Sequence, residues 1–189
     1  DDKFLVKLDW NINDSHRADF TYQYQSTAED KNTNDYSNSL NMDSHGYIDT
    51  TSLDNYAVHL YSDWNDDFST EVSIAYKDSY RESETNSYFG QVSVRTDSGT
   101  INAGQDVYRQ GNISSTKTWS YKFGANYLMD DHDIKFGASF EALDLYNLFS
   151  KESMGVWEFD SLEDFASGNI SSFSYSIAYT NDTDDASYT

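Results

Sequence analysis

The sequence has no cysteine and no proline among its 189 residues. Without cysteine there is neither a disulfide framework nor a thiolate metal site, and no segment reads as a proline-rich linker. Basic residues are scarce. The chain has 12 Lys and Arg but 33 Asp and Glu, which gives a net charge of -21. That balance argues against nucleic-acid binding and against electrostatic attraction to an anionic membrane surface. We interpret the acidity as a property of solvated loops.

Long apolar runs are also missing. The longest, such as Phe4–Val6, are very short, whereas a membrane-spanning helix needs about 18 apolar residues or more. This excludes a helical membrane protein but not a β-barrel, whose strands are only half apolar. The chain begins at DDKFL without an initiator methionine or an apolar signal segment, which indicates a processed chain or a piece of a longer one.

Aromatic residues are abundant, with 16 Tyr, 11 Phe and four Trp, and such side chains fit strands best. In the stretch from Leu8 to Tyr24 they alternate with polar residues on both sides of a short turn. Side chains on a strand point to opposite faces with a period of two. The stretch therefore predicts a hairpin with one apolar and one polar face.

The same alternation recurs along the chain, at residues 56–64, 72–76, 119–129, 134–142 and 173–179, with a weaker hairpin at 87–104. Short turns are expected at Asn13–His16, Trp64–Phe68, Thr96–Gly99 and Met129–His132. Between them lie longer polar connections, at Ser26–Asp54, Arg81–Asn86, Gln105–Ser115 and Asn147–Ser171. We predict an all-β fold, an antiparallel meander of about nine strands in which sequential strands pair.

Short turns that alternate with longer loops are typical of an outer-membrane barrel, and Tyr and Trp near strand ends are typical of its aromatic girdles. We predict that the apolar face contacts lipid through Val6, Leu8, Trp10, Ile12, Phe20, Tyr22, Tyr24, Trp119, Tyr121, Phe123, Phe136 and Phe140. The alternative is a soluble β-sheet whose aromatic face is buried in a protein core.

One short helix is predicted, in the SLEDFASG segment from Ser161 to Gly168. A serine followed three residues later by an aspartate, with a glycine at the end, fits one or two helical turns capped at both ends. We interpret the segment as a folded piece of a long external loop. Trp157, Phe159 and Phe165 are candidates there for contact with a ligand.

Motifs for catalysis are missing. The sequence has no HExxH, GxSxG, P-loop or GxGxxG pattern, so we predict no enzyme activity, no catalytic residue and no cofactor. The histidines, at positions 16, 45, 59 and 132, are interpreted as turn or surface residues. The acidic groups Asn181–Asp185 and Trp64–Asp67 lack the ligand spacing of a calcium loop, so no metal site is predicted.

Two consecutive stretches, IKFGASFEALDLYNLF and SMGVWEFDSLEDFASG, resemble the barrel region of TonB-dependent receptors of the Oar-like group. The matching positions are Asp144, Asn147, Leu148 and Phe149, then Phe159, Asp160, Ser161, Asp164, Phe165 and Gly168. The stretches LVKLDWNINDSHRADFTYQY and INAGQDVYRQGN are similar to the same family's strand and loop patterns. The resemblance covers most of the chain, and its middle third is the specific part.

The resemblance implies that residues 1–189 are a partial barrel region. Family members also carry a signal peptide, a TonB-contacting segment and a plug domain, in a barrel of about 22 strands, and no stretch here resembles a plug or a TonB box. The implied location is the outer membrane of a Gram-negative bacterium. The implied partners are outer-membrane lipid, the parent's plug domain, TonB and an unidentified extracellular ligand, and no nucleic acid.

Two other functions stay open from the sequence alone. One is a soluble extracellular β-sheet module that binds a ligand such as a carbohydrate, and the other is a passive barrel acting as an adhesin or porin. In the barrel interpretation the isolated chain keeps open strand edges and a wide aromatic face. We therefore expect it to form a dimer or small oligomer.

Overall fold

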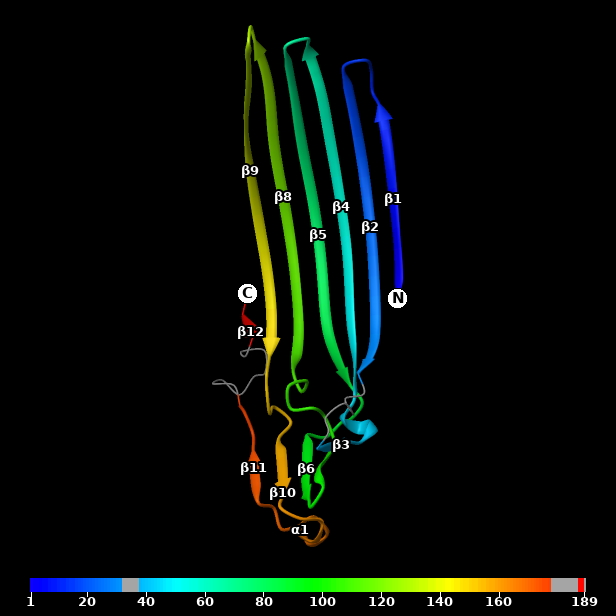
Figure 1. Cartoon of the computed structure of the whole chain (residues 1–189), viewed down its shortest axis with the longest axis vertical. Helices are drawn as coiled ribbons and strands as arrows, with labels where there is room; N and C mark the ends of the chain where they lie inside the picture. Colours follow the sequence, from blue (N-terminus) through cyan, green and yellow to red (C-terminus); the bar gives the residue numbers. More distant parts are fainter. Residues whose placement is uncertain (32–37, 178–186, 189) are drawn as a thin grey trace. The chain divides into compact units, whose positions relative to one another are not determined.

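Long antiparallel strands lie side by side in the order in which the chain makes them (Figure 1). They are β1 (Asp2–Asn11), β2 (His16–Lys31), β4 (Tyr47–Asn65), β5 (Phe68–Thr85), β8 (Asn112–Met129) and β9 (His132–Phe149), and β12 (Ser187–Tyr188) adds to β9. The computed structural model describes residues 1–31, 38–177 and 187–188. With 70% strand and 5% helix, the predicted all-β class is confirmed.

The first hairpin has the register that its alternation predicts. Val6 pairs with Tyr22 and Leu8 with Phe20, while Asp9 pairs with Asp19. Directly paired residues share a face of the sheet. The apolar and polar side chains of β1 and β2 therefore lie on opposite faces.

Tight turns join β1 to β2, β4 to β5 and β8 to β9, all at the same end of these strands (Figure 1). Asparagine and aspartate build them. The Asn65 side chain accepts a hydrogen bond from the Asp67 amide at 2.9 Å, and Asp130 has a φ of 52°. Asp and Asn bond to nearby backbone and tolerate a left-handed conformation, so these turns form without proline.

Residue contacts divide the chain into two units, which we describe separately. The sheet unit comprises residues 1–26, 52–80 and 115–145, and the loop unit comprises residues 27–51, 81–114 and 146–189. Several strands are longer than the sequence predicted. The connection predicted at Arg81–Asn86 is wrong, because β5 continues to Thr85, and β8 and β9 extend into the connections predicted at Gln105–Ser115 and Asn147–Ser171. The connection expected over Ser26–Asp54 is shorter, because β2 continues to Lys31 and β4 begins at Tyr47.

The loop unit contains a second sheet that the sequence did not predict. Its order is β11-β10-β6-β7-β3, formed by β3 (Ser39–Asn41), β6 (Gln91–Thr96), β7 (Gly99–Ala103), β10 (Val156–Phe159) and β11 (Ser172–Ser174). The hairpin predicted at 87–104 is present as β6 and β7, but it belongs to this sheet. The prediction of one antiparallel meander is wrong here, because β10 pairs with β6 and β3 with β7 in parallel.

A row of polar residues crosses this second sheet. The strand register aligns Asn41, Asn102, Ser93, Glu158 and Ser172. The Asn102 amide donates to the Asn41 side-chain oxygen at 2.8 Å, and Ser93 donates to the Asn102 oxygen at 2.8 Å. Side-chain hydrogen bonds satisfy polar groups that would otherwise be costly to bury. The bond between Asn102 and Asn41 joins β7 to its parallel neighbour β3, which lies 61 residues earlier in the sequence.

The predicted helix is present as α1 (Leu162–Ser167), and both predicted caps are confirmed. The Ser161 hydroxyl accepts a hydrogen bond from the Asp164 amide at 3.0 Å, and Gly168 takes the left-handed conformation with a φ of 72°. The run predicted at 173–179 contributes only β11, and its last two residues lie outside the described part of the chain. Within the described ranges, no helix is long and apolar enough to cross a membrane.

Candidate functional site

The most extensive unpartnered feature of the sheet unit is its apolar face. Large hydrophobic side chains stand exposed along it, including Leu8 (61% exposed), Trp10 (65%) and Phe140 (65%). Soluble proteins rarely leave contiguous apolar patches larger than a few hundred Å² open to water, and a larger one marks an interaction surface. Each of the residues predicted to face lipid belongs to this face by register or by ring contact, except Ile12, which lies in the turn after β1.

Aromatic rings form an unbroken row across every long strand of the sheet unit. We call this set, far from the tight turns, the distal row; it comprises Phe4, Tyr22, Tyr56, Tyr76, Trp119, Tyr121 and Phe140. Successive ring centroids are 4.6 Å apart at the closest pair and 6.4 Å apart at the widest. These ring contacts show that the apolar sides of all six strands lie on one face of the sheet.

A second aromatic set lies near the tight turns, and we call it the turn-side row. It consists of Trp10, Trp64, Phe68 and Tyr127. The Phe68 and Tyr127 rings meet edge to face at 6.3 Å, and the Trp64 indole donates to the Thr70 hydroxyl at 2.9 Å. The apolar bodies and polar tips of Trp and Tyr suit a boundary between an apolar and a polar medium.

The two rows bound a mainly apolar band of defined height. Tyr56 and Trp64 on β4 are eight positions apart, as are Trp119 and Tyr127 on β8. At about 3.3 Å per residue this is about 26 Å along a strand. The apolar-face positions inside the band carry the polar residues Ser62 and Thr70 near the turn-side row. The other positions there are apolar, among them Val6, Leu8, Val58, Leu60, Val72, Ile74, Phe123, Ala125, Phe136 and Ala138.

Farther from the tight turns than the distal row, the same face of the sheet is polar. The residues on it there are Asp2, Ser26, Asp54, Asp78, Lys117 and Asp144. Two of these carboxylates accept hydrogen bonds from tyrosines of the distal row. The Tyr22 hydroxyl donates to Asp54 at 2.6 Å, and the Tyr76 hydroxyl donates to Asp78 at 3.1 Å. The phenol rings thus lie on the apolar side of the boundary and their hydroxyls on the polar side.

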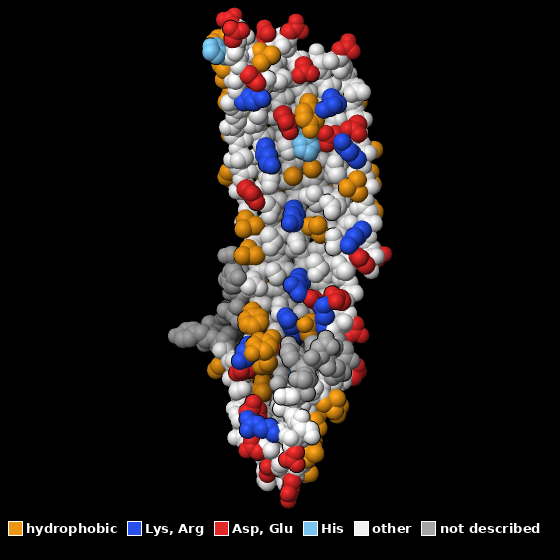
Figure 2. Space-filling model, viewed as in Figure 1, with side chains coloured by type: hydrophobic (Ala, Val, Ile, Leu, Met, Phe, Trp, Pro, Cys, Tyr) orange, Lys and Arg blue, Asp and Glu red, His pale blue; other side chains and the backbone are white. Residues whose placement is uncertain are grey.

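The opposite face of the sheet unit is polar, and Figure 2 shows Lys and Arg spread along it among Asp and Glu. Asp19 is buried and hydrogen-bonded to His59 at 2.9 Å, and the Arg17 guanidinium lies 4.6 Å from the centre of the Tyr61 ring. Six of the 12 basic residues project from this face, at positions 3, 7, 17, 77, 122 and 135. The face thus carries charged side chains of both signs.

Ion pairs and hydrogen bonds hold the loop unit together. The Arg81 guanidinium donates twice to the Asp49 carboxylate, at 3.0 and 2.5 Å. This bidentate contact holds the pKa of Asp49 below its ordinary value. His45 ends the one-turn 3-10 helix η1 (Asp43–His45), so it is a turn residue as predicted, but it does not lie at the surface. It is buried, with its Nδ1 3.0 Å from the Gly104 carbonyl.

The three residues proposed for ligand contact have different surroundings. Phe159 is 7% exposed and packs edge to face on Phe165 at 5.2 Å. Trp157 is half-buried and faces the Phe173 ring at 5.0 Å, and Phe165 is exposed. Phe159 therefore anchors α1 to β10, whereas Trp157 and Phe165 keep surface that a ligand can reach.

No family model, curated protein or solved structure matches the chain. Among the described residues, no group of three or more His, Asp and Glu is arranged to hold a metal ion. The apolar band between its two aromatic rows is accordingly the candidate site that carries the functional argument. The mainly acidic residues beyond the distal row, such as Asp54 and Asp78, were not recognised from the sequence, because only the alignment of the strands brings them together.

Proposed function

We propose that the chain forms part of the wall of a transmembrane β-barrel in a bacterial outer membrane. One observation carries the proposal, the apolar band of about 26 Å between two aromatic rows. Transmembrane barrels carry an outward apolar band about 25 Å tall with an aromatic girdle at each interface. Strand tilt reduces the height of our band to about 20 Å along the membrane normal at a tilt of about 40°, which suits the thin outer membrane.

The particular barrel that we assign is a TonB-dependent receptor of the Oar-like group. Support comes from the sequence resemblance over Ile134–Phe149 and Ser153–Gly168. In this assignment the parent imports a large or scarce ligand with energy delivered through TonB. The polar face of the sheet unit lines the lumen and faces the plug domain, and the loop unit belongs to the connections that meet the ligand.

A membrane experiment tests the barrel. The chain is refolded into short-chain phosphatidylcholine vesicles, floated on a density gradient and washed with alkaline carbonate. We expect it to float, to resist the wash and to keep a β-type circular dichroism spectrum. A chain that stays soluble, compact and β-rich without vesicles would favour the alternative, a soluble module whose apolar face is covered by protein.

A sequence determination tests the receptor assignment separately. We expect the gene region upstream of the codon for Asp1 to encode a plug domain. An upstream region that encodes only further strand–turn–strand repeats would contradict the receptor and favour a passive adhesin or porin barrel, while leaving the membrane proposal intact.

A further inference from the structure

The long strands at the two sides of the sheet unit, β1 and β9, each keep an exposed edge. All ten residues of β1 are exposed, and so are residues 132–144 of β9. β12 pairs with β9 beyond that stretch, at Asn147 and Leu148. The edge of a strand presents a row of backbone N–H and C=O groups on which another chain can pair. The two edges are therefore interaction surfaces of comparable length.

The strand directions suit pairing of the β9 edge with β1 of a second copy of this chain. β1 runs toward the tight turns and β9 runs away from them (Figure 1). A second copy set beside β9 in the same orientation therefore presents its β1 antiparallel to β9, with the tight turns of both copies at one end. Antiparallel pairing of β1 with β1, or of β9 with β9, would require one copy to be inverted. Contact between unlike edges thus keeps the distal rows of the two copies level.

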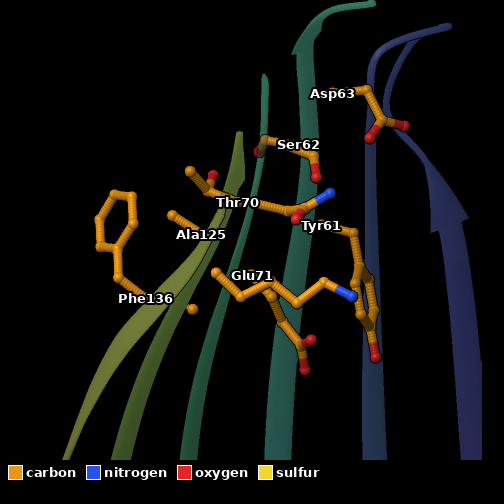
Figure 3. A pocket seen from close by; sticks show the side chains of 11 residues that line it. Tyr61, Ser62, Asp63, Thr70, Glu71, Ala125 and Phe136 are labelled. Atoms are coloured by element: carbon orange, nitrogen blue, oxygen red, sulfur yellow. The ribbon is translucent and has the colours of Figure 1, made fainter. Parts of the chain in front are cut away.

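Alignment of the distal rows defines one register for this contact. Phe4 and Phe140 end the row at the two edges, so placing them opposite each other carries the row from one copy into the next. Figure 3 shows Phe136 pointing away from Tyr61 and Glu71, as expected for even-numbered side chains of β9 on the apolar face. In this register apolar side chains meet across the contact, as Val6 with Ala138, Leu8 with Phe136 and Trp10 with Ile134.

Charges on the polar face match in the same register. Lys3 lies opposite Glu141, and Asp9 lies opposite Lys135. Directly opposite side chains have Cβ atoms about 4.5–5.5 Å apart, and opposite charges there are favourable. Three of these residues already have an exposed partner two positions along their own strand, in the pairs Lys3–Asp1, Asp9–Lys7 and Lys135–Asp133. Such exposed ion pairs contribute little to stability, so they do not prevent a contact between the strands.

Neighbouring registers lose this match. A shift of one residue would exchange the two faces of the sheet. A shift of two in one direction sets like charges opposite each other, Lys7 with Lys135 and Asp9 with Asp133. A shift of two in the other direction gives no opposite-charge pair and sets Asp2 opposite Asp144. A shift of four in either direction leaves one opposite-charge pair and separates Phe4 from Phe140. Charge therefore favours the register that also aligns the distal rows.

We propose that β9 of one copy pairs antiparallel with β1 of a second copy, with Phe140 opposite Phe4. The contact uses a different edge on each copy, so each added copy leaves one β1 edge and one β9 edge open until a ring closes. In a barrel made by one longer chain, the same edges meet further strands of that chain; between separate copies they meet each other. The inference concerns the edges, so it does not depend on the medium that covers the apolar band.

Cysteine cross-linking tests the register in the full chain, which has no cysteine of its own. Chains with Leu5→Cys are mixed in detergent micelles with chains with Ser139→Cys, whose positions lie opposite each other in the proposed register, and the mixture is oxidised. Leu5→Cys mixed with Leu143→Cys is the control, because four residues along a strand are about 13 Å. We expect the first mixture to form cross-linked dimers on the order of tenfold faster, since a disulfide does not reach across the larger separation.

Three outcomes of this experiment would overturn the pairing. They are equal rates in the two mixtures, no cross-linked dimer in either mixture, and faster cross-linking within Leu5→Cys or Ser139→Cys alone than in their mixture. The last would show that each edge pairs with itself. None of them bears on the membrane proposal, because vesicle flotation reports on the apolar face and cross-linking reports on the edges.

A charge exchange tests the same register independently. Lys3→Glu, added to the Leu5→Cys chain, sets like charges opposite each other and should slow cross-linking in the first mixture about threefold to tenfold. Glu141→Lys, added to the Ser139→Cys chain, should restore the rate. Glu71→Lys on β5 makes the same change in net charge away from the edges and should not restore it. Equal recovery with Glu71→Lys, or no recovery with Glu141→Lys, would contradict the proposed register.

Discussion

Replacing Phe123 by arginine puts a charge in the middle of the apolar band. Phe123 lies four residues from Trp119 and four from Tyr127, which is about 13 Å along the strand from either aromatic row. Its ring contacts Phe136 with a centroid distance of 6.3 Å. If the band contacts hydrocarbon, the arginine stands near the bilayer midplane.

The expected loss of stability follows from that depth. Arginine on the lipid face of a barrel costs about 2–4 kcal/mol at the midplane and about 0–1 kcal/mol near the interfaces. The lost aromatic pair adds about 0.5–1.5 kcal/mol. We therefore expect Phe123→Arg to lower the free energy of unfolding by about 3–5 kcal/mol. Tyr127→Arg, at the boundary, also loses a ring contact, with Phe68, and should lower it by about 1–2 kcal/mol.

The assay is urea unfolding of the chain in short-chain phosphatidylcholine vesicles, followed by tryptophan fluorescence. Ser120→Arg is the control, because Ser120 lies on the polar face of the same strand and its replacement should change stability by about 0.5 kcal/mol or less. Equal losses in Phe123→Arg and Ser120→Arg would refute the assignment of the two faces. Equal losses in Phe123→Arg and Tyr127→Arg would refute the depth argument.

Three further predictions concern other parts of the molecule. Because Arg81 lowers its pKa, the Asp49 carboxylate contributes stability that is complete above its ordinary pKa of 3.8 and is lost as the pH falls through the lowered folded value. In Arg81→Gln, carboxyl NMR should show the Asp49 titration midpoint returning to its ordinary value, and a midpoint unchanged from that of the unaltered chain would contradict the ion pair. Ser161→Ala removes the hydrogen bond to the Asp164 amide and should destabilise α1 by about 1 kcal/mol, which hydrogen exchange of the first-turn amides would register as roughly fivefold less protection. Without detergent or lipid the chain should sediment as a dimer or small oligomer that tightens as salt screens its charge of -21, and a compact monomer at every concentration would speak against an exposed apolar band.

The long strands could be predicted because their information is local. Alternation with a period of two assigns Leu8 and Phe20 to one face and Asp9 and Asp19 to the other, and Asn and Asp mark the turns between strands. The caps of α1 were predictable for the same reason, since Ser161, Asp164 and Gly168 lie within one short segment. Each of these signals depends on neighbours a few residues apart.

The loop unit could not be predicted because its pairings are distant in sequence. Parallel pairing of β10 with β6 brings Val156 beside Gln91. Nothing in the sequence of either strand indicates that the other is its partner. The burial of His45 follows from the same tertiary arrangement, since its partner Gly104 is 59 residues away. The end of β2 was predicted wrongly for a related reason. Backbone hydrogen bonds between strands extend β2 to Lys31, through residues whose polarity does not alternate.

The adjacent glycines of β8 and β9 show a third kind of limit. Gly124 and Gly137 are visible in the sequence as two glycines within alternating runs. Only the register of β8 against β9 reveals that they are adjacent. A sequence pattern gives the face of each residue, but it does not give the neighbour across the strand.

Depth-dependent quenching of tryptophan fluorescence tests the membrane band most directly. Single-tryptophan variants retain Trp64, Trp119 or Trp157, or carry Phe123→Trp as their sole tryptophan, and are refolded into vesicles with lipids brominated at defined depths. The band predicts that the tryptophan at position 123 is quenched most by bromines deep in the acyl chains, that Trp64 and Trp119 are quenched most by shallow ones, and that Trp157 is not quenched. Equal or absent quenching at positions 64, 119 and 123 would contradict the assignment of this face to lipid.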